Sequence, residues 1–151
     1  MAERRAKRGK AKRGEGPAPA RPAKLDGEVS TYAAPAAIGP YVQARAVAGW
    51  LFCSGQIGLD PESGTLVTGG VRPETRRALA NLEAVVSAAG LTLADVVKTT
   101  IYLIDMADFA DVNEVYAEVF RAPFPARATV GVASLPKSAR IEIEAIARRP
   151  R

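Results

Sequence analysis

The stretch that decides the fold spans residues 73–103 and reads PETRRALANLEAVVSAAGLTLADVVKTTIYL. Its first half starts with proline, has glycine at position 90, and carries an apolar stripe at helical spacing: Leu79, Leu82, Val85, Val86 and Ala89. This pattern predicts a helix over residues 73–89. Residues 96–103 are rich in β-branched side chains, which predicts a strand. A helix followed closely by a strand indicates a domain that mixes both.

The flanking sequence extends this pattern in both directions. Three short strands are expected before the helix, over residues 29–32, 41–47 and 50–54. After the strand, Asp105 is expected to cap a second helix, one side of which carries Phe109, Val112, Asn113, Tyr116, Val119 and Phe120. Two further strands surround Arg127 and Glu142. The order predicts a single α+β domain, with a six-stranded sheet and both helices packed on one face.

Composition limits the chemistry that this chain can perform. The sequence has 151 residues, 48% of them apolar, with no histidine and a single cysteine, Cys53. An intramolecular disulfide, a Cys/His zinc site and a histidine-dependent catalytic triad are therefore excluded. Any general base must be a carboxylate, lysine, tyrosine or terminal amine. Cys53 alternates away from Ser54, so we expect it in the core, and we predict no metal site.

The positive charge is concentrated at the N-terminus. Residues 1–25 hold nine basic and two acidic side chains, a net charge of +7, with no aromatic or branched aliphatic residue before Leu25. This composition predicts a disordered basic tail, followed by a folded domain over residues 26–151. The tail is either a solvated extension or a weak nucleic-acid contact. Neither a membrane-spanning run nor a secretory leader is recognised, so we expect a cytoplasmic protein without a membrane partner.

Two motifs near the C-terminus are candidates for a reactive site. Pro125-Ala126-Arg127 offers a guanidinium, and Ile141-Glu142-Ile143-Glu144 offers two carboxylates on the same face of a strand. Strands joined through the turn Ser134-Leu135-Pro136-Lys137 can be neighbours that place Arg127 and Glu142 on one sheet face, although the spacing does not require it. The alternative is an edge hairpin with solvated charges.

Five blocks resemble, in order and over about residues 29–148, the RidA/YjgF family of reactive intermediate deaminases. They are Ala34-Pro35-Ala36-Ala37-Ile38-Gly39-Pro40-Tyr41, Ser54-Gly55-Gln56-Ile57, Val97-Lys98-Thr99-Thr100, Asp108-Phe109 with Val112-Asn113, and the two motifs above. The resemblance implies a chorismate-mutase-like α+β fold that forms a homotrimer with active sites between subunits. It implies neither a metal nor an organic cofactor.

The resemblance also implies hydrolysis of 2-aminoacrylate and related enamines or imines, released by pyridoxal-phosphate enzymes, to 2-keto acids and ammonia. By residue matching, Arg127 binds the substrate carboxylate and Glu142 handles the water, while the pocket is lined by Tyr41, Ser54, Gly55, Asn113 and Thr129. A guanidinium can grip a carboxylate with two parallel hydrogen bonds. Thr129 stands where many members carry cysteine, so no thiol chemistry is transferred.

Several points stay open at this stage. Glu144 would raise the pKa of Glu142 and Arg127 would lower it, so the sequence decides no direction. Other functions are also compatible with the chain. One is a nucleic-acid-associated protein acting through the tail, in line with the family's older association with RNA cleavage and translation inhibition. Another is a chaperone-like trimer with a vestigial pocket.

Overall fold

The structure is a computed structural model that describes residues 25–150. The predicted tail, apart from its last residue, and its nucleic-acid contact lie outside this range. Leu25, assigned above to the tail, is 6% exposed, and its carbonyl accepts a hydrogen bond from the Gly49 N–H. Leu25 is therefore part of the hydrophobic core. Within the described range, no helix is long and apolar enough to cross a bilayer.

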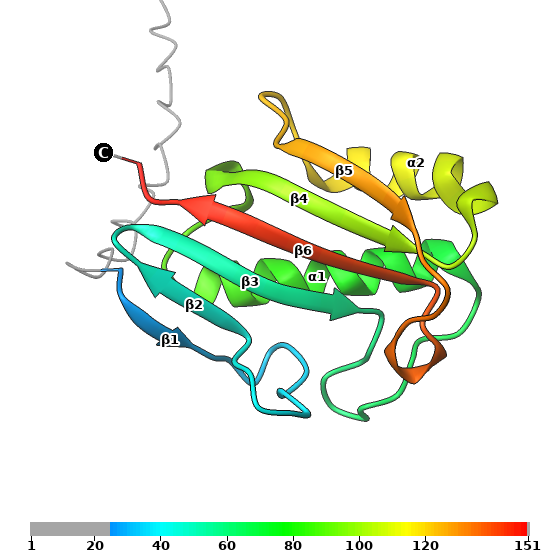
Figure 1. The fold of residues 1–151 in the computed structure, drawn as a ribbon, viewed down its shortest axis with the longest axis horizontal. Coiled ribbons are helices and arrows are strands. Elements are labelled where there is room, and N and C mark those ends of the chain that lie inside the picture. Colours follow the sequence, from blue (N-terminus) through cyan, green and yellow to red (C-terminus); the bar gives the residue numbers. More distant parts are fainter. Residues whose placement is uncertain (1–24, 151) are drawn as a thin grey trace, which may run out of the picture.

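The domain is α+β, with one six-stranded sheet and two α-helices behind it (Figure 1). The strands are β1 (Gly27–Val29), β2 (Ala44–Val47), β3 (Trp50–Ile57), β4 (Val96–Leu103), β5 (Ala126–Gly131) and β6 (Ile141–Arg148), and the helices are α1 (Val71–Ala88) and α2 (Phe109–Val119). The predicted strand over residues 96–103 is confirmed, as are the six strands and two helices of the predicted architecture.

The strand order is β1-β2-β3-β6-β4-β5. β1, β2 and β3 form an antiparallel meander, and β6 lies antiparallel between β3 and β4. β5 pairs in parallel with β4, because α2 carries the chain back across the sheet before β5 begins. β4 therefore separates β5 from β6. The expectation that the Arg127 and Glu142 strands are neighbours is wrong.

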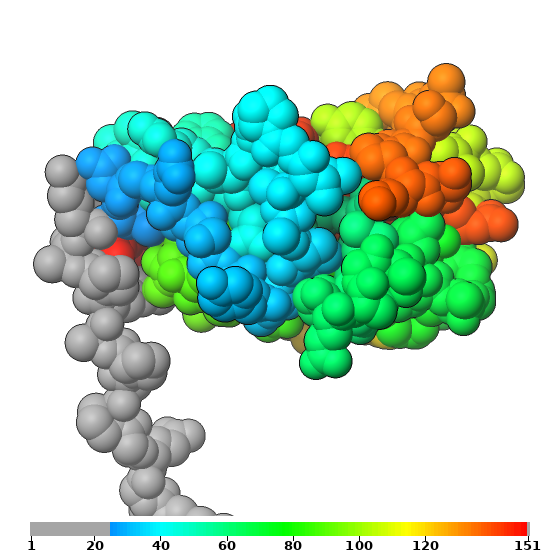
Figure 2. Space-filling view, turned by 90° about the horizontal axis from the view of Figure 1, so that it is seen from below, coloured from blue at the N-terminus to red at the C-terminus, as the bar shows by residue number. Residues whose placement is uncertain are grey.

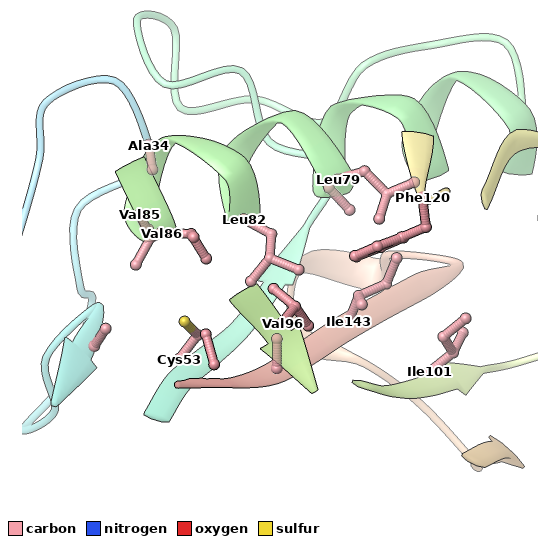
Figure 3. Close-up of a cluster of buried hydrophobic side chains, with 14 of the residues drawn as sticks. Ala34, Cys53, Leu79, Leu82, Val85, Val86, Val96, Ile101, Phe120 and Ile143 are labelled. Carbon is pink, nitrogen blue, oxygen red and sulfur yellow. The ribbon is translucent and has the colours of Figure 1, made fainter. Parts of the chain in front are cut away.

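The core lies between the helices and one face of the sheet, as Figure 3 shows for the side chains around α1. All five residues of the predicted α1 stripe are buried. α2 packs on the same side of the sheet, where the Tyr116 hydroxyl lies 2.9 Å from the Thr99 hydroxyl of β4. Cys53 is 6% exposed, and burial raises the pKa of its thiol to about 12. The predicted core role of Cys53 is confirmed.

The other face of the sheet, here called the open face, is covered by neither helix. Along β6, Ile141, Ile143 and Ala145 are buried toward the helices, and Glu142 and Glu144 alternate onto the open face. Apolar side chains on this face are substantially exposed: Val47, Trp50, Phe52 and Val130. Exposed apolar residues gathered on one face indicate a contact surface.

Several predicted boundaries shift. The first strand ends at Val29 and the second starts at Ala44, so residues 30–43 form a connection where we expected parts of two strands. The third strand continues to Ile57 because β6 also pairs with Gln56 and Ile57, beyond an irregular step after Cys53. α1 begins at Val71, before Pro73, since proline is tolerated in the first turn of a helix. Asp105 caps a short 3₁₀ turn that precedes α2.

Truncating the α1 stripe should destabilise the domain. Leu82 is fully buried, so Leu82→Ala should lower the free energy of unfolding by about 2–5 kcal/mol through lost burial and a residual cavity. Urea denaturation at fixed protein concentration measures this loss. Glu83→Ala, on the exposed side of the same helix, is the control and should change stability by less than about 0.5 kcal/mol. Equal effects of the two substitutions would contradict the assigned helix face.

Candidate active site

A cavity of about 400 Å³ opens where β3 ends and β6 begins. It is lined by Pro35, Ala36, Ile38, Tyr41, Gln43, Ser54, Gly55, Gln56, Ile57, Leu59, Pro136 and Glu142. Three connections, over residues 30–43, 58–70 and 132–140, meet at this edge of the domain (Figure 2). The cavity brings together four of the predicted site residues, Tyr41, Ser54, Gly55 and Glu142. Its wall is mostly apolar, with the Glu142 carboxylate as its charged group.

Gly55 is required by the closeness of Glu142. The β3–β6 register shifts between Cys53 and Gln56, which leaves Ser54 and Gly55 in an irregular step of the ladder. A Cβ on Gly55 would overlap the Glu142 carboxylate and lie 2.6 Å from its Cδ. Absence of a side chain at position 55 therefore makes the space in which the carboxylate sits.

The environment of Glu142 raises the pKa of its carboxyl. Partial burial raises the pKa of this carboxyl above its ordinary value, and the like charge of Glu144 raises it further. Glu144 is held by the Tyr102 hydroxyl, which donates a 3.1 Å hydrogen bond to it. The direction that the sequence left open is thus upward. A carboxylate with a raised pKa binds a proton more readily than an ordinary one, which suits it to general acid-base catalysis.

The hydroxyl groups of Ser54 and Tyr41 each make one hydrogen bond within the chain. The Ser54 hydroxyl donates to the Val42 carbonyl at 2.6 Å, so only its oxygen lone pairs can serve a ligand. The Tyr41 hydroxyl accepts from the Ile38 N–H at 3.3 Å, which leaves its own hydrogen available to donate. Tyr41 lines the cavity and is 49% exposed there.

The remaining predicted residues form a second group, on β5 and α2. Arg127 donates a 2.7 Å hydrogen bond to the Asn113 side-chain oxygen, and its guanidinium lies 4.9 Å from the Tyr116 ring centroid and 5.8 Å from that of Phe109. The Thr129 hydroxyl is buried and has no hydrogen-bond partner within the described range. The polar side chain of Asn113, on the otherwise apolar side of α2, thus has Arg127 as its partner.

Arg127 and Glu142 lie on opposite faces of the sheet. Arg127 is in register with Thr99, which is buried toward the helices. Glu142 is in register with Tyr102 of the same strand β4, three residues further along, and side chains alternate between faces. The shared face that the spacing permitted is not found within a single chain, because Thr99 and Tyr102, the register partners of the two residues, point to opposite faces of β4. Within one chain the predicted site residues form two separate groups, here called half-sites: the cavity with Glu142, and Arg127, Thr129 and Asn113 on β5 and α2.

The sequence analysis did not identify three buried polar residues that hold the walls of the site: Gln43, Glu74 and Asn81. The Asn81 amide donates to the carbonyls of Ile57 and Leu59, both in the cavity wall. A carboxylate oxygen of Glu74 accepts from the N–H of Arg140, just before β6. An asparagine inside an apolar helical stripe was the available signal for Asn81, since a buried amide must find partners. Residues 25–150 contain no cluster of His, Cys, Asp and Glu able to hold a metal ion.

Comparison with known proteins agrees with this architecture. A family model described as Endoribonuclease L-PSP matches residues 31–149. The human protein named 2-iminobutanoate/2-iminopropanoate deaminase is 54% identical over 119 residues, which cover 79% of this chain and 87% of the human one. The crystal structure of the Escherichia coli YjgF gene product has a TM-score of 0.75 at 44% identity, covering 82% of this chain and 98% of that one. The E. coli protein TdcF, solved with bound serine, has a TM-score of 0.75 at 41% identity and the same coverage.

A single α+β domain with this sheet, and with a carboxylate cavity at its edge, defines the class of small RidA-like proteins. The chain belongs to the RidA/YjgF family, and the resemblance drawn from its five sequence blocks is confirmed.

The raised pKa of Glu142 predicts a specific pH dependence. The folded protein holds this proton more tightly than the unfolded chain, so stability falls as pH rises from the ordinary value of 4.5 through the folded pKa. Glu142→Gln stays neutral and should be more stable than the parent above that interval, as measured by urea denaturation across a pH series.

A direct titration of the Glu142 carboxyl carbon by NMR checks the cause. Glu144→Gln should lower the pKa of Glu142 yet leave it above its ordinary value, because burial is the larger contribution. Glu83→Gln, on the outer side of α1, is the matched control and should leave the titration unchanged. A Glu142 pKa at or below its ordinary value would contradict the assigned environment.

Proposed function

We propose that this chain is a 2-iminobutanoate/2-iminopropanoate deaminase, which hydrolyses reactive imines and enamines of small amino acids to 2-keto acids and ammonia. The observation that carries the proposal is the half-buried Glu142 carboxylate, with its raised pKa, inside a largely apolar cavity. It stands in a chain 54% identical to a human protein named for this activity.

Glu142 is the general base and acid of the proposed reaction. It takes a proton from a water molecule while the water oxygen attacks the C=N carbon, and the π electrons of that bond move onto nitrogen. The carboxylic acid then returns the proton to the nitrogen, which gives a carbon that carries both a hydroxyl and an amino group. Glu142 next accepts the hydroxyl proton and passes it to the amino nitrogen, so that the C–N bond breaks, ammonia leaves and the C=O bond forms. Each step conserves charge and atoms, and none needs a redox partner. An enamine enters the same sequence after its tautomer, the imine, has formed.

Arg127 is the proposed clamp for the substrate carboxylate. Its planar guanidinium can form two parallel hydrogen bonds to a carboxylate. Asn113 holds one guanidinium nitrogen, and the rings of Tyr116 and Phe109 flank the cation. These contacts fix the orientation of the side chain, and Thr129 lies two residues further along the same strand face. Tyr41, Ser54 and Gly55 complete the proposed substrate-binding residues on the Glu142 side.

A homotrimer is proposed to join the two half-sites. Arg127 and Glu142 occupy opposite faces of one sheet, so one small substrate can touch both only if Arg127 comes from a neighbouring copy. The exposed apolar side chains of the open face support association through that face. Three copies related by a threefold axis would contain three equivalent sites.

The activity is tested in a coupled assay, in which a pyridoxal-phosphate lyase releases 2-aminoacrylate and pyruvate appearance is followed. The parent should accelerate pyruvate formation, and Arg127→Ala should lower kcat/KM by about a hundredfold through lost orientation of the substrate. Arg127→Lys should recover only part of this loss, because lysine keeps the charge without the two-pronged geometry.

Arg76→Ala is the matched control. It removes a half-exposed arginine that pairs with Glu118, and neither residue lines the cavity or is among the α2 side chains described above beside Arg127. Its kinetics should equal those of the parent. A parent that is folded and gives no acceleration would overturn the deaminase assignment, and full activity of Arg127→Ala would overturn the clamp.

A further inference from the structure

Gln43 is a buried glutamine, 4% exposed, at the point where the chain enters β2. Its side-chain oxygen accepts a 2.6 Å hydrogen bond from the Thr31 N–H. Its side-chain nitrogen lies within hydrogen-bond distance of three carbonyls, those of Thr31 at 3.0 Å, Ala34 at 3.1 Å and Pro35 at 2.7 Å. One amide group therefore fastens both the start and the middle of the connection that precedes it.

The fastened connection has little else to hold it. Residues 31–41, here called the wall loop, include two prolines, which have no N–H to donate. Tyr32 is fully exposed and Ile38 is 65% exposed, while Ala34 is the one buried apolar residue of the loop. With so little apolar surface buried, the position of the wall loop depends on polar contacts, and Gln43 supplies most of those that reach outside it.

The wall loop forms one side of the cavity. Pro35, Ala36, Ile38 and Tyr41 line that side, and Gln43 lies in the lining beside them. The backbone of the same segment is joined to β3, since the Ser54 N–H donates to the Gln43 carbonyl at 3.0 Å. Gln43 thus links the strand that carries Ser54 and Gly55 to the loop that carries Tyr41.

We infer that Gln43 is a positioning residue, which sets the wall loop against Glu142 and so fixes the shape of the substrate cavity. This inference rests on the proposed deaminase function. Glutamine suits the role because its amide offers two donors and one acceptor in one plane, at a length that reaches both Thr31 and Pro35. Methionine has a similar length and volume but neither set of groups.

Gln43→Met is therefore the test variant, and Thr75→Val is its matched control. Thr75 is also fully buried and donates one hydrogen bond to a backbone carbonyl, that of Val71, but this bond lies within α1 and outside the cavity lining. Both variants should unfold at lower temperature than the parent. Only Gln43→Met should speed amide hydrogen exchange in residues 31–41.

The kinetic readout separates positioning from general stability. Well below the unfolding temperature, Gln43→Met should lose roughly tenfold to a hundredfold in kcat/KM, mostly as a raised KM, because the wall that orients the substrate has moved. Thr75→Val should keep the kinetics of the parent. Calorimetry should likewise show weaker binding of the product 2-ketobutanoate to Gln43→Met than to the parent, and unchanged binding to Thr75→Val.

Two results would overturn the inference. Unchanged exchange in the wall loop of Gln43→Met would show that the amide does not hold it, whatever the enzyme does. Faster exchange with unchanged KM and 2-ketobutanoate affinity would show that the loop does not position substrate. A parent that neither forms keto acid nor binds 2-ketobutanoate would instead overturn the proposed function, and the positioning role with it.

Discussion

The parallel pairing of β5 with β4 is the constraint on which the rest of the site depends. α2 returns the chain across the sheet, so β5 is added outside β4, and β6 fills the space between β3 and β4. Side-chain alternation then directs Arg127 toward the helices and Glu142 toward the open face. This fold keeps the cation and the base apart within one chain, and the proposed function therefore requires a second copy of the chain.

Around Glu142 the structure uses buried polar groups where a core would use apolar ones. The irregular step at Ser54 and Gly55 makes room for the carboxylate. Gln43 and Asn81 hold the connections that wall the cavity. Such amides contribute modestly to stability when satisfied and cost more when a partner is lost. Their value lies in fixing loop geometry, while the helical stripe of α1 supplies the hydrophobic stabilisation.

Local features of the chain could be predicted from the sequence. The stripe of α1 and the β-branched run of β4 have clear periodicity, and Cys53 follows from strand alternation. The order of neighbouring strands could not be predicted. A connection with a 3₁₀ turn at Pro136–Ser138 can join two adjacent strands, or two strands with a third between them, as it does here. The direction of the Glu142 pKa shift needed the distance to Arg127, which only the sheet order supplies. The role of Gln43 left no periodic signal, since its partners are backbone atoms.

The most direct test of the two-half-site arrangement is complementation between inactive variants. Arg127→Ala and Glu142→Gln, each expected to be strongly impaired alone, are unfolded together, refolded as an equal mixture and assayed for keto-acid formation. Random assembly makes about three quarters of the trimers mixed, and each mixed trimer regains one intact site out of three. We therefore expect about one quarter of the parent activity. Mixed trimers that form, as shown by native mass measurement, and yet remain inactive would contradict a site shared between copies.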